Sequence, residues 1–331
     1  MQEKIKKLNL EINKAKNIVL FTHIRMDPDT FGSAAALYYI LEKMWKNVIL
    51  LNDEEAQNDF SFLWANEIVL SNYELSQFKP DLAISLDAAS TEQLAQSYEQ
   101  NKEIIKNIPF FVIDHHITNP WFWKVNIIDI NSSSTCELLF NILKEIDLKK
   151  YIDEKIATLL MAWILTDTNV FYNTNVTHQT HKVSAELLKL WANSRLAIFN
   201  FFKKRSLLKT KVLAKALSKI EIKKLDAING HLYNKNIIYT ILEKSDFEEL
   251  WATDKETNWI IEHLINIEDC EIAFIIYPLA DWKNKVSFRS HSFNVSEIAQ
   301  ILWWGWHKQA AWASSEKKIN LFLEEILEKI Y

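Results

Sequence analysis

One short stretch of the chain joins an apolar run to three side chains that can bind metals. Phe111-Val112-Ile113 is followed directly by Asp114, His115 and His116. A short apolar run that ends in polar groups is typical of a buried parallel strand, and the active sites of open α/β sheets lie at the carboxyl ends of such strands. Whether this cluster is a site depends on whether other strands end in similar residues.

Other apolar runs do end in such residues. His23, Asp27 and Asp29 follow the run 17–21, Asp87 follows the run 82–86, and Asp167 follows a helical pattern. Singly, each residue has a plainer interpretation: Asp87 as a turn or cap residue, Asp29 as a helix cap, and His23 as a core histidine. Together they place five aspartates and three histidines at one edge of a predicted sheet.

The ligand types indicate the metals. Imidazole with carboxylate is the ligand set for Mn²⁺, Fe²⁺, Zn²⁺ or Co²⁺, whereas magnesium alone is expected to use mainly oxygen atoms. The ligands are too many for one ion and enough for two. Two ions about 3.5–4 Å apart are typical of enzymes that direct an in-line attack on phosphorus with a bridging hydroxide.

The predicted elements give an α/β fold. In the first half, apolar strands at 17–21, 48–51, 82–86, 110–113 and 125–128 alternate with helical patterns, which predicts a doubly wound parallel sheet. In the second half, strands at 237–242, 270–277 and 285–289 among helical patterns predict a smaller α/β domain. We expect a catalytic domain over 1–190, a helical linker over 191–224, which includes a basic stretch from 202, and a substrate-binding domain over 225–331.

Composition excludes several classes of protein. The 331 residues are 49% hydrophobic and 24% charged, which is ordinary for a soluble globular protein. The net charge of −5 argues against a broad basic face for long duplex nucleic acid. Two distant cysteines, the absence of a signal-peptide pattern and the absence of an 18-residue apolar run predict a reduced cytoplasmic protein without a membrane partner. Dimerisation is left open.

The ordered motifs resemble the DHH phosphoesterase family. They are His23-x3-Asp27-x-Asp29-x2-Gly32-Ser33, Asp87, Asp114-His115-His116 and Asp167-Thr168. Val286-Ser287-Phe288-Arg289-Ser290, followed by Gly305-x-His307, resembles the family's C-terminal DHHA1 domain. Length and domain order are similar to the nanoRNase (oligoribonuclease)/pAp-phosphatase branch, which implies hydrolysis of very short oligonucleotides or of 3′-phosphoadenosine 5′-phosphate.

The resemblance also implies roles for single residues. Two divalent metal ions, with Mn²⁺ expected, would be held by His23, Asp27 and Asp87 and by Asp29, Asp87, His115 and Asp167. The catalytic set would be Asp87, His116 at the scissile phosphate and Asp114 orienting the imidazoles. The substrate would be bound across an interdomain cleft by Arg289, Ser290, Gly305 and His307. If the resemblance is set aside, Arg289 can be interpreted equally well as a solvated charge at a strand end.

The C-terminal motif departs from the family's glycine-rich run. It reads Trp303-Trp304-Gly305-Trp306-His307, and indoles cannot give the close backbone approach to phosphate that glycine allows. The whole chain has 3 glycines and 13 tryptophans, where about 23 glycines are expected at an average usage of about 7%. One hypothesis is that most or all of the tryptophans are UGA codons that the cell reads as glycine. The alternative is a genuinely tryptophan-rich chain with a blocked second domain.

Other functions fit parts of the pattern. A phosphodiesterase of cyclic or linear dinucleotides would keep the same fold and metal site. A family II inorganic pyrophosphatase shares the first four motifs but not Arg289-Ser290 and His307. A non-catalytic nucleotide-binding module is disfavoured because every expected ligand is present, and genuine tryptophans at the C-terminal motif would revive it.

Overall fold

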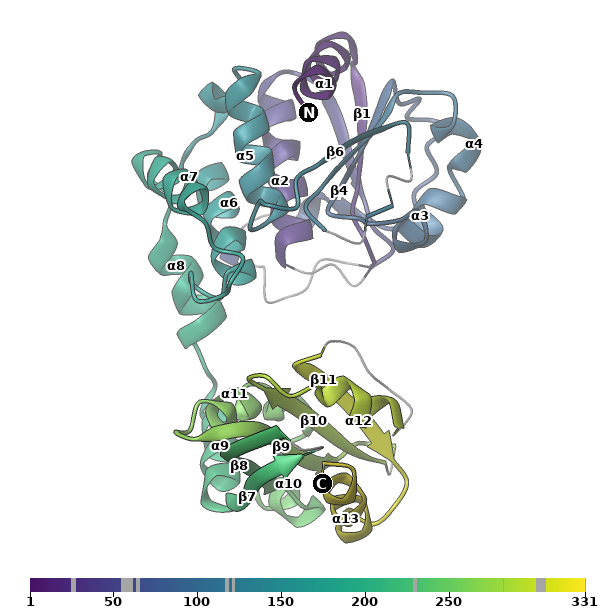
Figure 1. Cartoon of the computed structure of the whole chain (residues 1–331). Coiled ribbons are helices and arrows are strands. Elements are labelled where there is room, and N and C mark those ends of the chain that lie inside the picture. Colours follow the sequence, from purple (N-terminus) through teal and green to yellow (C-terminus); the bar gives the residue numbers. More distant parts are fainter. Residues whose placement is uncertain are drawn as a thin grey trace. The chain divides into compact units, whose positions relative to one another are not determined.

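The protein is described by a computed structural model and divides into two compact units, Met1–Lys204 and Arg205–Tyr331 (Figure 1). Each unit is described by itself below. The structure describes residues 1–24, 28–54, 62–63, 66–116, 119–120, 123–228, 231–281, 283–301 and 308–330.

The first unit is built on a six-stranded parallel sheet with the order β3-β2-β1-β4-β5-β6. Its strands are β1 (Asn17–Phe21), β2 (Asn47–Leu51), β3 (Val69–Leu70), β4 (Leu82–Leu86), β5 (Phe110–Asp114) and β6 (Val125–Ile128). Its α-helices are α1 (Gln2–Lys14), α2 (Pro28–Lys43), α3 (Ala95–Glu99), α4 (Lys102–Ile105), α5 (Thr135–Glu145), α6 (Glu154–Asp167), α7 (His178–Lys189) and α8 (Ser194–Ile198), the last followed by a π-helical turn (Phe199–Lys203).

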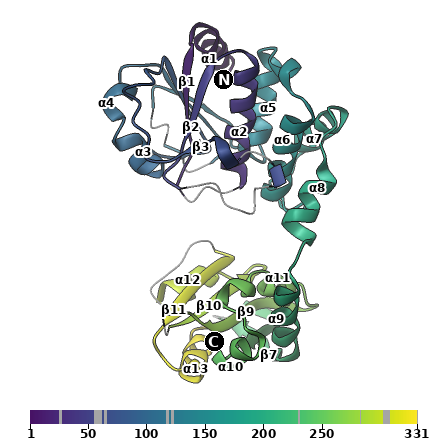
Figure 2. The same cartoon turned by 180° about the vertical axis from the view of Figure 1, so that it is seen from behind.

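Helices cover both faces of this sheet. Successive residues of a strand point to opposite faces. Accordingly, Ile18 and Leu20 of β1 join a core with α1, α2, α5 and α6, whereas Val19 and Phe21 join a core with α3 and α4 (Figures 1 and 2). Burial on both faces explains why β4 and β5 are continuously apolar until they end. The doubly wound parallel sheet predicted from the sequence is confirmed.

Side-chain caps fix where two helices of this unit begin. The Ser134 hydroxyl accepts the backbone N–H of Glu137 at the start of α5, and the Asp153 carboxylate accepts that of Ile156 at the start of α6. Both satisfy N–H groups that the helix itself leaves without an acceptor. The Ser134 cap positions α5 beside the ends of the strands.

The second unit has a five-stranded mixed sheet with the order β11-β10-β9-β8-β7. Only the β8–β9 pair is parallel among the described strands of this sheet. One core lies between the sheet and helices α9 to α11, and another lies between the sheet and helices α12 and α13. The elements are α9 (Leu207–Ser218), β7 (Glu221–Ile228), β8 (His231–Ile241), α10 (Lys244–Leu250), α11 (Ile260–Ile265), β9 (Cys270–Pro278), β10 (Asn284–Ser290), α12 (Val295–Ile301), β11 (Ala310–Ser315) and α13 (Ile319–Ile330).

The segment 191–224, expected to be helical, is only partly so. It contains α8, the π-helical turn and α9, but the helix ends at Ser218 and the edge strand β7 begins at Glu221. Glu221, Lys223 and Lys224 are exposed on this edge strand, and charged side chains are common where a sheet edge faces water. The prediction of a helix up to residue 224 was wrong, because glutamate and lysine have high helix propensity even where, as here, they lie in a strand.

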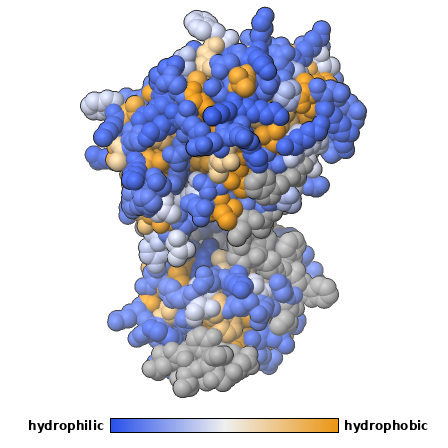
Figure 3. Space-filling model, turned by 45° about the horizontal axis from the view of Figure 1, so that its top comes forward, coloured by the Kyte–Doolittle hydropathy of each residue, from blue (hydrophilic) through white to orange (hydrophobic). Residues whose placement is uncertain are grey.

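Among the described residues on the face shown in Figure 3, hydrophobic residues lie in groups among hydrophilic ones. No helix among the described residues is long and apolar enough to cross a membrane.

Candidate metal centre

The chemistry-bearing residues lie at the carboxyl ends of three adjacent strands. His23 follows β1, Asp87 directly follows β4, and Asp114 ends β5 immediately before His115 and His116. The strand order reverses between β1 and β4, because β2 lies on one side of β1 and the later strands lie on the other. Such a switch point is where open α/β sheets bind ligands.

Asp87 is the centre of the cluster. Its side chain is 2% exposed, and two hydroxyls hold it: Thr30 donates to Oδ2 at 2.6 Å and Thr135 donates to Oδ1 at 2.8 Å. Oδ2 lies 3.8 Å from Nε2 of His23, and Oδ1 lies 3.8 Å from Nε2 of His115. The two carboxylate oxygens thus face different imidazoles, as a bridging ligand requires.

Asp29 lies in the first turn of α2 and is held by the beginning of α5. Its carboxylate accepts the backbone N–H groups of Thr135 at 2.5 Å and of Cys136 at 3.1 Å. A helix N-terminus favours a negative charge, so the beginning of α5 is a suitable partner for this carboxylate. Asp29 Oδ2 also lies 3.8 Å from Nε2 of His115. Burial and the neighbouring Asp29 raise the pKa of the Cys136 thiol well above its ordinary value, so it stays protonated.

Asp167 reaches the cluster from the end of α6. Its Oδ2 lies 3.6 Å from Nε2 of His115, and its backbone carbonyl accepts the Asn173 amide at 2.9 Å. The chain then turns sharply, because Asn169, Val170 and Phe171 all have positive φ angles, of 47°, 57° and 65°. Left-handed backbone is costly for bulky residues, and strained backbone of this kind clusters at functional sites.

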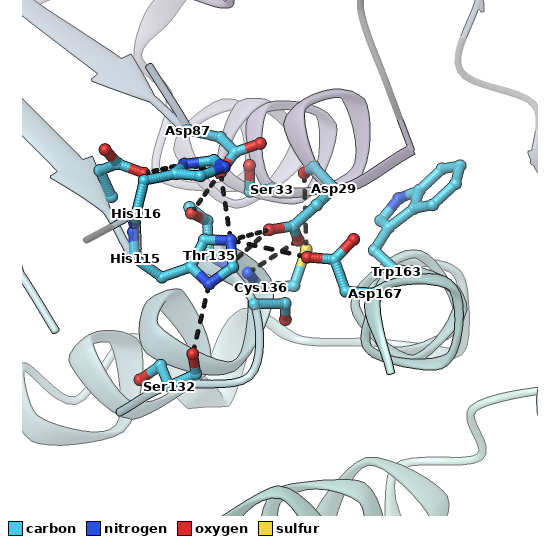
Figure 4. Close-up of polar contacts among 12 residues, drawn as sticks. Asp29, Ser33, Asp87, His115, His116, Ser132, Thr135, Cys136, Trp163 and Asp167 are labelled. Atoms are coloured by element: carbon cyan, nitrogen blue, oxygen red, sulfur yellow. Dashed lines mark hydrogen bonds and ion pairs between the residues drawn. The ribbon is translucent and has the colours of Figure 1, made fainter. Parts of the chain in front are cut away.

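The imidazole of His115 points its Nε2 into this group of carboxylates (Figure 4). Its Nδ1 lies 3.3 Å from the carbonyl oxygen of Ser132, so a proton on Nδ1 is donated to that oxygen. Nε2 is then left with its lone pair facing the aspartates. A ligating histidine usually has its other ring nitrogen held in this way.

Asp114 and His116 form a tight pair at the edge of the cluster. Nδ1 of His116 lies 2.7 Å from Oδ1 of Asp114, and the Asn119 amide donates to Oδ2 at 2.7 Å. The hydrogen bond from Asp114 raises the pKa of His116 to about 9, against the opposing effect of burial. Burial alone would raise the pKa of Asp114, but the hydrogen bond and charge of His116 and the Asn119 bond lower it.

The donor set fits divalent cations. In each of two sets of three residues, the ligand atoms lie within 4.8 Å of one another. The sets are Asp87 with His115 and His116, and Asp29 with His115 and Asp167. Asp29 and Asp87 are almost fully buried, and buried carboxylates this close together need positive charge to compensate them. Asp27 lies outside the described residues. The structure therefore brings together His23, Asp29, Asp87, His115 and Asp167 of the predicted ligands.

The predicted substrate-binding residues belong to the second unit. Nε of Arg289 donates to Oε1 of Glu262 at 2.9 Å, and the side chain is about one-third exposed, at 35%. The Ser290 hydroxyl donates to the carbonyl oxygen of Phe293 at 2.5 Å. Gly305 and His307 lie outside the described residues, so their role stays a prediction.

Sequence reasoning missed the polar groups that hold the ligands. Thr30, Thr135, Asn119 and Ser132 contact Asp87, Asp114 or His115. A signal was present for one of them, because Thr135 ends a run of four hydroxyl side chains before an apolar helix. In this run Ser134 caps α5, and the hydroxyl of the next residue, Thr135, donates to Asp87.

Gly32 and Trp163 pack against each other beside Asp167. A Cβ atom on Gly32 would lie only 1.1 Å from Cδ1 of the Trp163 indole, which is fully buried. Figure 4 shows the indole next to Asp167 on α6. With an indole at position 163, therefore, only glycine fits at position 32 of α2.

Comparison with known proteins finds similar sequences. Residues 17–164 match the DHH family, N-terminal domain. The chain is 26% identical over 303 residues to the Bifunctional oligoribonuclease and PAP phosphatase NrnA of Bacillus subtilis, covering 90% of this chain and 88% of the relative. The protein of the same name from Mycoplasma genitalium is 26% identical over 323 residues, covering 96% and 95%.

The fold is also found in a solved structure. The crystal structure of an exopolyphosphatase-related protein from Bacteroides fragilis superposes with a TM-score of 0.82 at 18% identity and covers 100% of this chain and 96% of that one. The N-terminal part of the chain is thus similar to the DHH family, N-terminal domain, and the relatives named oligoribonuclease and PAP phosphatase point to a phosphoesterase hydrolase.

Proposed function

We propose that the protein hydrolyses the phosphodiester bonds of very short oligonucleotides, the 3′-phosphate of 3′-phosphoadenosine 5′-phosphate, or both. The observation that carries this proposal is the arrangement of Asp87, whose two oxygens face His23 on one side and His115 on the other. The relatives named oligoribonuclease and PAP phosphatase support the choice of substrate class.

We propose two divalent cations, with Mn²⁺ the expected ion because the ligands mix imidazole and carboxylate. His23, Asp27 and Asp87 would hold one, and Asp29, Asp87, His115 and Asp167 would hold the other. When bound, the pair would supply an activated water and neutralise charge on the phosphoryl group. The protein's own contribution is to fix the carboxylates: Thr30 and Thr135 fix Asp87, and the N-terminus of α5 fixes Asp29.

His116 is proposed to contact the scissile phosphate. It is 43% exposed, more than His115 at 15%, so it can meet a substrate while Asp114 holds its Nδ1. The pairing with Asp114 favours the imidazolium form, which attracts a phosphate oxygen. Arg289 is proposed to bind a terminal phosphate. Its Nε donates to Glu262, and a phosphate can either take the place of Glu262 or accept from other N–H groups of the same guanidinium.

Substrate assays test the proposal. Purified protein is incubated with a ribodinucleotide, with 3′-phosphoadenosine 5′-phosphate, with a cyclic dinucleotide and with pyrophosphate, after chelation and with added Mn²⁺. We expect mononucleotides or AMP from the first two substrates only with the metal. Turnover of pyrophosphate alone, or of none of the four with Mn²⁺ bound, would contradict the proposal.

Asp87→Asn tests the metal assignment. It removes the charge that faces both sets of ligands, so we expect a loss of turnover by at least about 10³-fold together with weaker Mn²⁺ binding in calorimetry. Asp281→Asn, at an exposed aspartate in the second unit, is the control and should behave as the unmodified protein does. Retained turnover in Asp87→Asn would rule out a bridging role.

A further inference from the structure

Four tryptophans lie at backbone positions that favour glycine. Trp45, Trp191, Trp251 and Trp259 have φ angles of 60°, 67°, 54° and 82°. The structure describes the backbone of seven tryptophans, so more than half of these are in the left-handed region. In that region a Cβ atom crowds the backbone, and a bulky residue there is a genuine outlier.

The end of α2 shows what position 45 does. The backbone N–H of Trp45 donates to the carbonyl of Glu42 at 2.8 Å, and that of Lys46 donates to the carbonyl of Leu41 at 3.1 Å. This pair of bonds is a Schellman motif, in which the first residue past the helix turns left-handed and is usually glycine. Trp45 occupies that glycine position.

The end of α7 has the same pair of bonds. Trp191 N–H donates to Leu188 at 3.0 Å, and Ala192 N–H donates to Leu187 at 3.1 Å. Position 191 is again the left-handed residue of a Schellman motif.

The end of α10 repeats the motif in the second unit. Trp251 N–H donates to Glu248 at 3.3 Å, and Ala252 N–H donates to Phe247 at 2.9 Å. Three helices of the chain therefore stop with the same backbone geometry and the same unexpected residue.

The indoles at these helix ends gain little that would offset the strain. Trp45, Trp191 and Trp251 are 95%, 80% and 92% exposed as whole residues. Val170 and Phe171 differ, because their left-handed turn lies beside the metal cluster and the Thr168 hydroxyl accepts the N–H of Phe171 at 3.1 Å. Backbone strain is common at functional sites such as the proposed metal site, whereas at an exposed helix end it serves no such purpose.

We infer that the protein as its cell makes it has glycine at positions 45, 191, 251 and 259, because these codons are UGA and are read as glycine. Composition agrees, since glycine and tryptophan together make up about 5% of the chain, near the usual share of glycine. The inference does not depend on the proposed function. Trp303, Trp304 and Trp306 lie outside the described residues, and their codons decide whether the same reading extends to the C-terminal motif.

The coding DNA and the native protein give the direct test. We expect UGA at all four codons, and peptides from protein purified from the native cells with the mass of glycine at each position. UGG at these codons would overturn the inference, and so would UGA with peptides that have the mass of tryptophan.

Thermal unfolding tests the backbone argument separately. A chain made with tryptophan is compared with the triple variants Trp45→Gly/Trp191→Gly/Trp251→Gly and Trp45→Ala/Trp191→Ala/Trp251→Ala. Both remove the exposed indoles, but alanine keeps the Cβ. We expect the glycine variant to raise the Tm by about 4–8 °C and the alanine variant to leave it nearly unchanged. Equal shifts in the two variants, or no gain with glycine, would overturn the argument.

Discussion

At the scale of single residues, the centre depends on hydroxyl groups as well as on its ligands. A carboxylate that bridges two sites must be held in one rotation about its Cβ–Cγ bond, and Asp87 has a hydroxyl donor on each oxygen. Thr30 comes from α2 and Thr135 from α5, so two helices on one face of the sheet set the orientation of a residue that follows β4.

We expect Thr135→Val to weaken Mn²⁺ binding by about 10–100-fold, the usual effect of removing a group that orients a ligand. Valine keeps the shape of the side chain but cannot donate to Asp87. Thr135→Ser restores the hydroxyl and should restore most of the affinity. Calorimetric titration with Mn²⁺ measures both variants, and circular dichroism checks that both are folded. Equal affinities of the valine variant and the unmodified protein would show that the hydroxyl does not position Asp87.

Several of the proposed ligands were accessible to sequence reasoning because they follow apolar strands. Asp87 and Asp114-His115-His116 stand where a buried run stops, and a parallel sheet brings such ends together. Thr30 and Asn119 could not be found in that way. Their partners are distant in the sequence or lie across a turn, and hydroxyl and amide residues are common at surfaces and caps.

At the scale of elements, strands buried on both faces were the most predictable. The strands at 82–86 and 125–128 were predicted with the bounds observed, because their apolar runs stop at turn residues. The strands at the edges of the second sheet were missed. β7 is rich in charged helix-forming residues, and β11 begins with two alanines, so pairing with a neighbouring strand rather than intrinsic preference makes them strands.

Contacts between helices also rest on buried charges, as Asp246 shows. This aspartate is 5% exposed, accepts the backbone N–H of Glu243 at 2.8 Å at the start of α10, and pairs with Lys219, just after α9. Burial alone would raise the pKa of Asp246, but these hydrogen bonds and the lysine charges lower it. The ionised form is therefore the one that stabilises the fold.

We expect Asp246→Asn to lower the free energy of unfolding by about 1–3 kcal/mol at pH 7. Because the folded pKa is lowered, this contribution is complete above the pKa of the unfolded chain, about 3.9, and is lost as the pH falls through the folded value. Urea unfolding at pH 7 and pH 3 should show the gap between variant and unmodified protein closing in acid. A gap that stays constant would mean that packing, not charge, holds Asp246.

At the scale of the whole molecule, the chain forms two units with separate hydrophobic cores. All the described residues proposed as metal ligands lie in Met1–Lys204, and Arg289, proposed to bind phosphate, lies in Arg205–Tyr331. Each unit has a sheet covered on both faces, and chains of these lengths bury enough apolar surface to fold alone. Metal binding and substrate binding should therefore be separable.

Expression of residues 1–204 and 205–331 as separate proteins tests this division. We expect the first to unfold cooperatively and to bind Mn²⁺ with nearly the affinity of the full chain, and the second to fold without binding the metal. Neither alone should hydrolyse a dinucleotide at more than a small fraction of the full chain's rate, because the proposed phosphate contact of Arg289 is lost from the first. Circular dichroism, Mn²⁺ calorimetry and the dinucleotide assay measure these outcomes. Full activity of 1–204 would remove the second unit from the reaction, and an unfolded 1–204 would show that the two cores depend on each other.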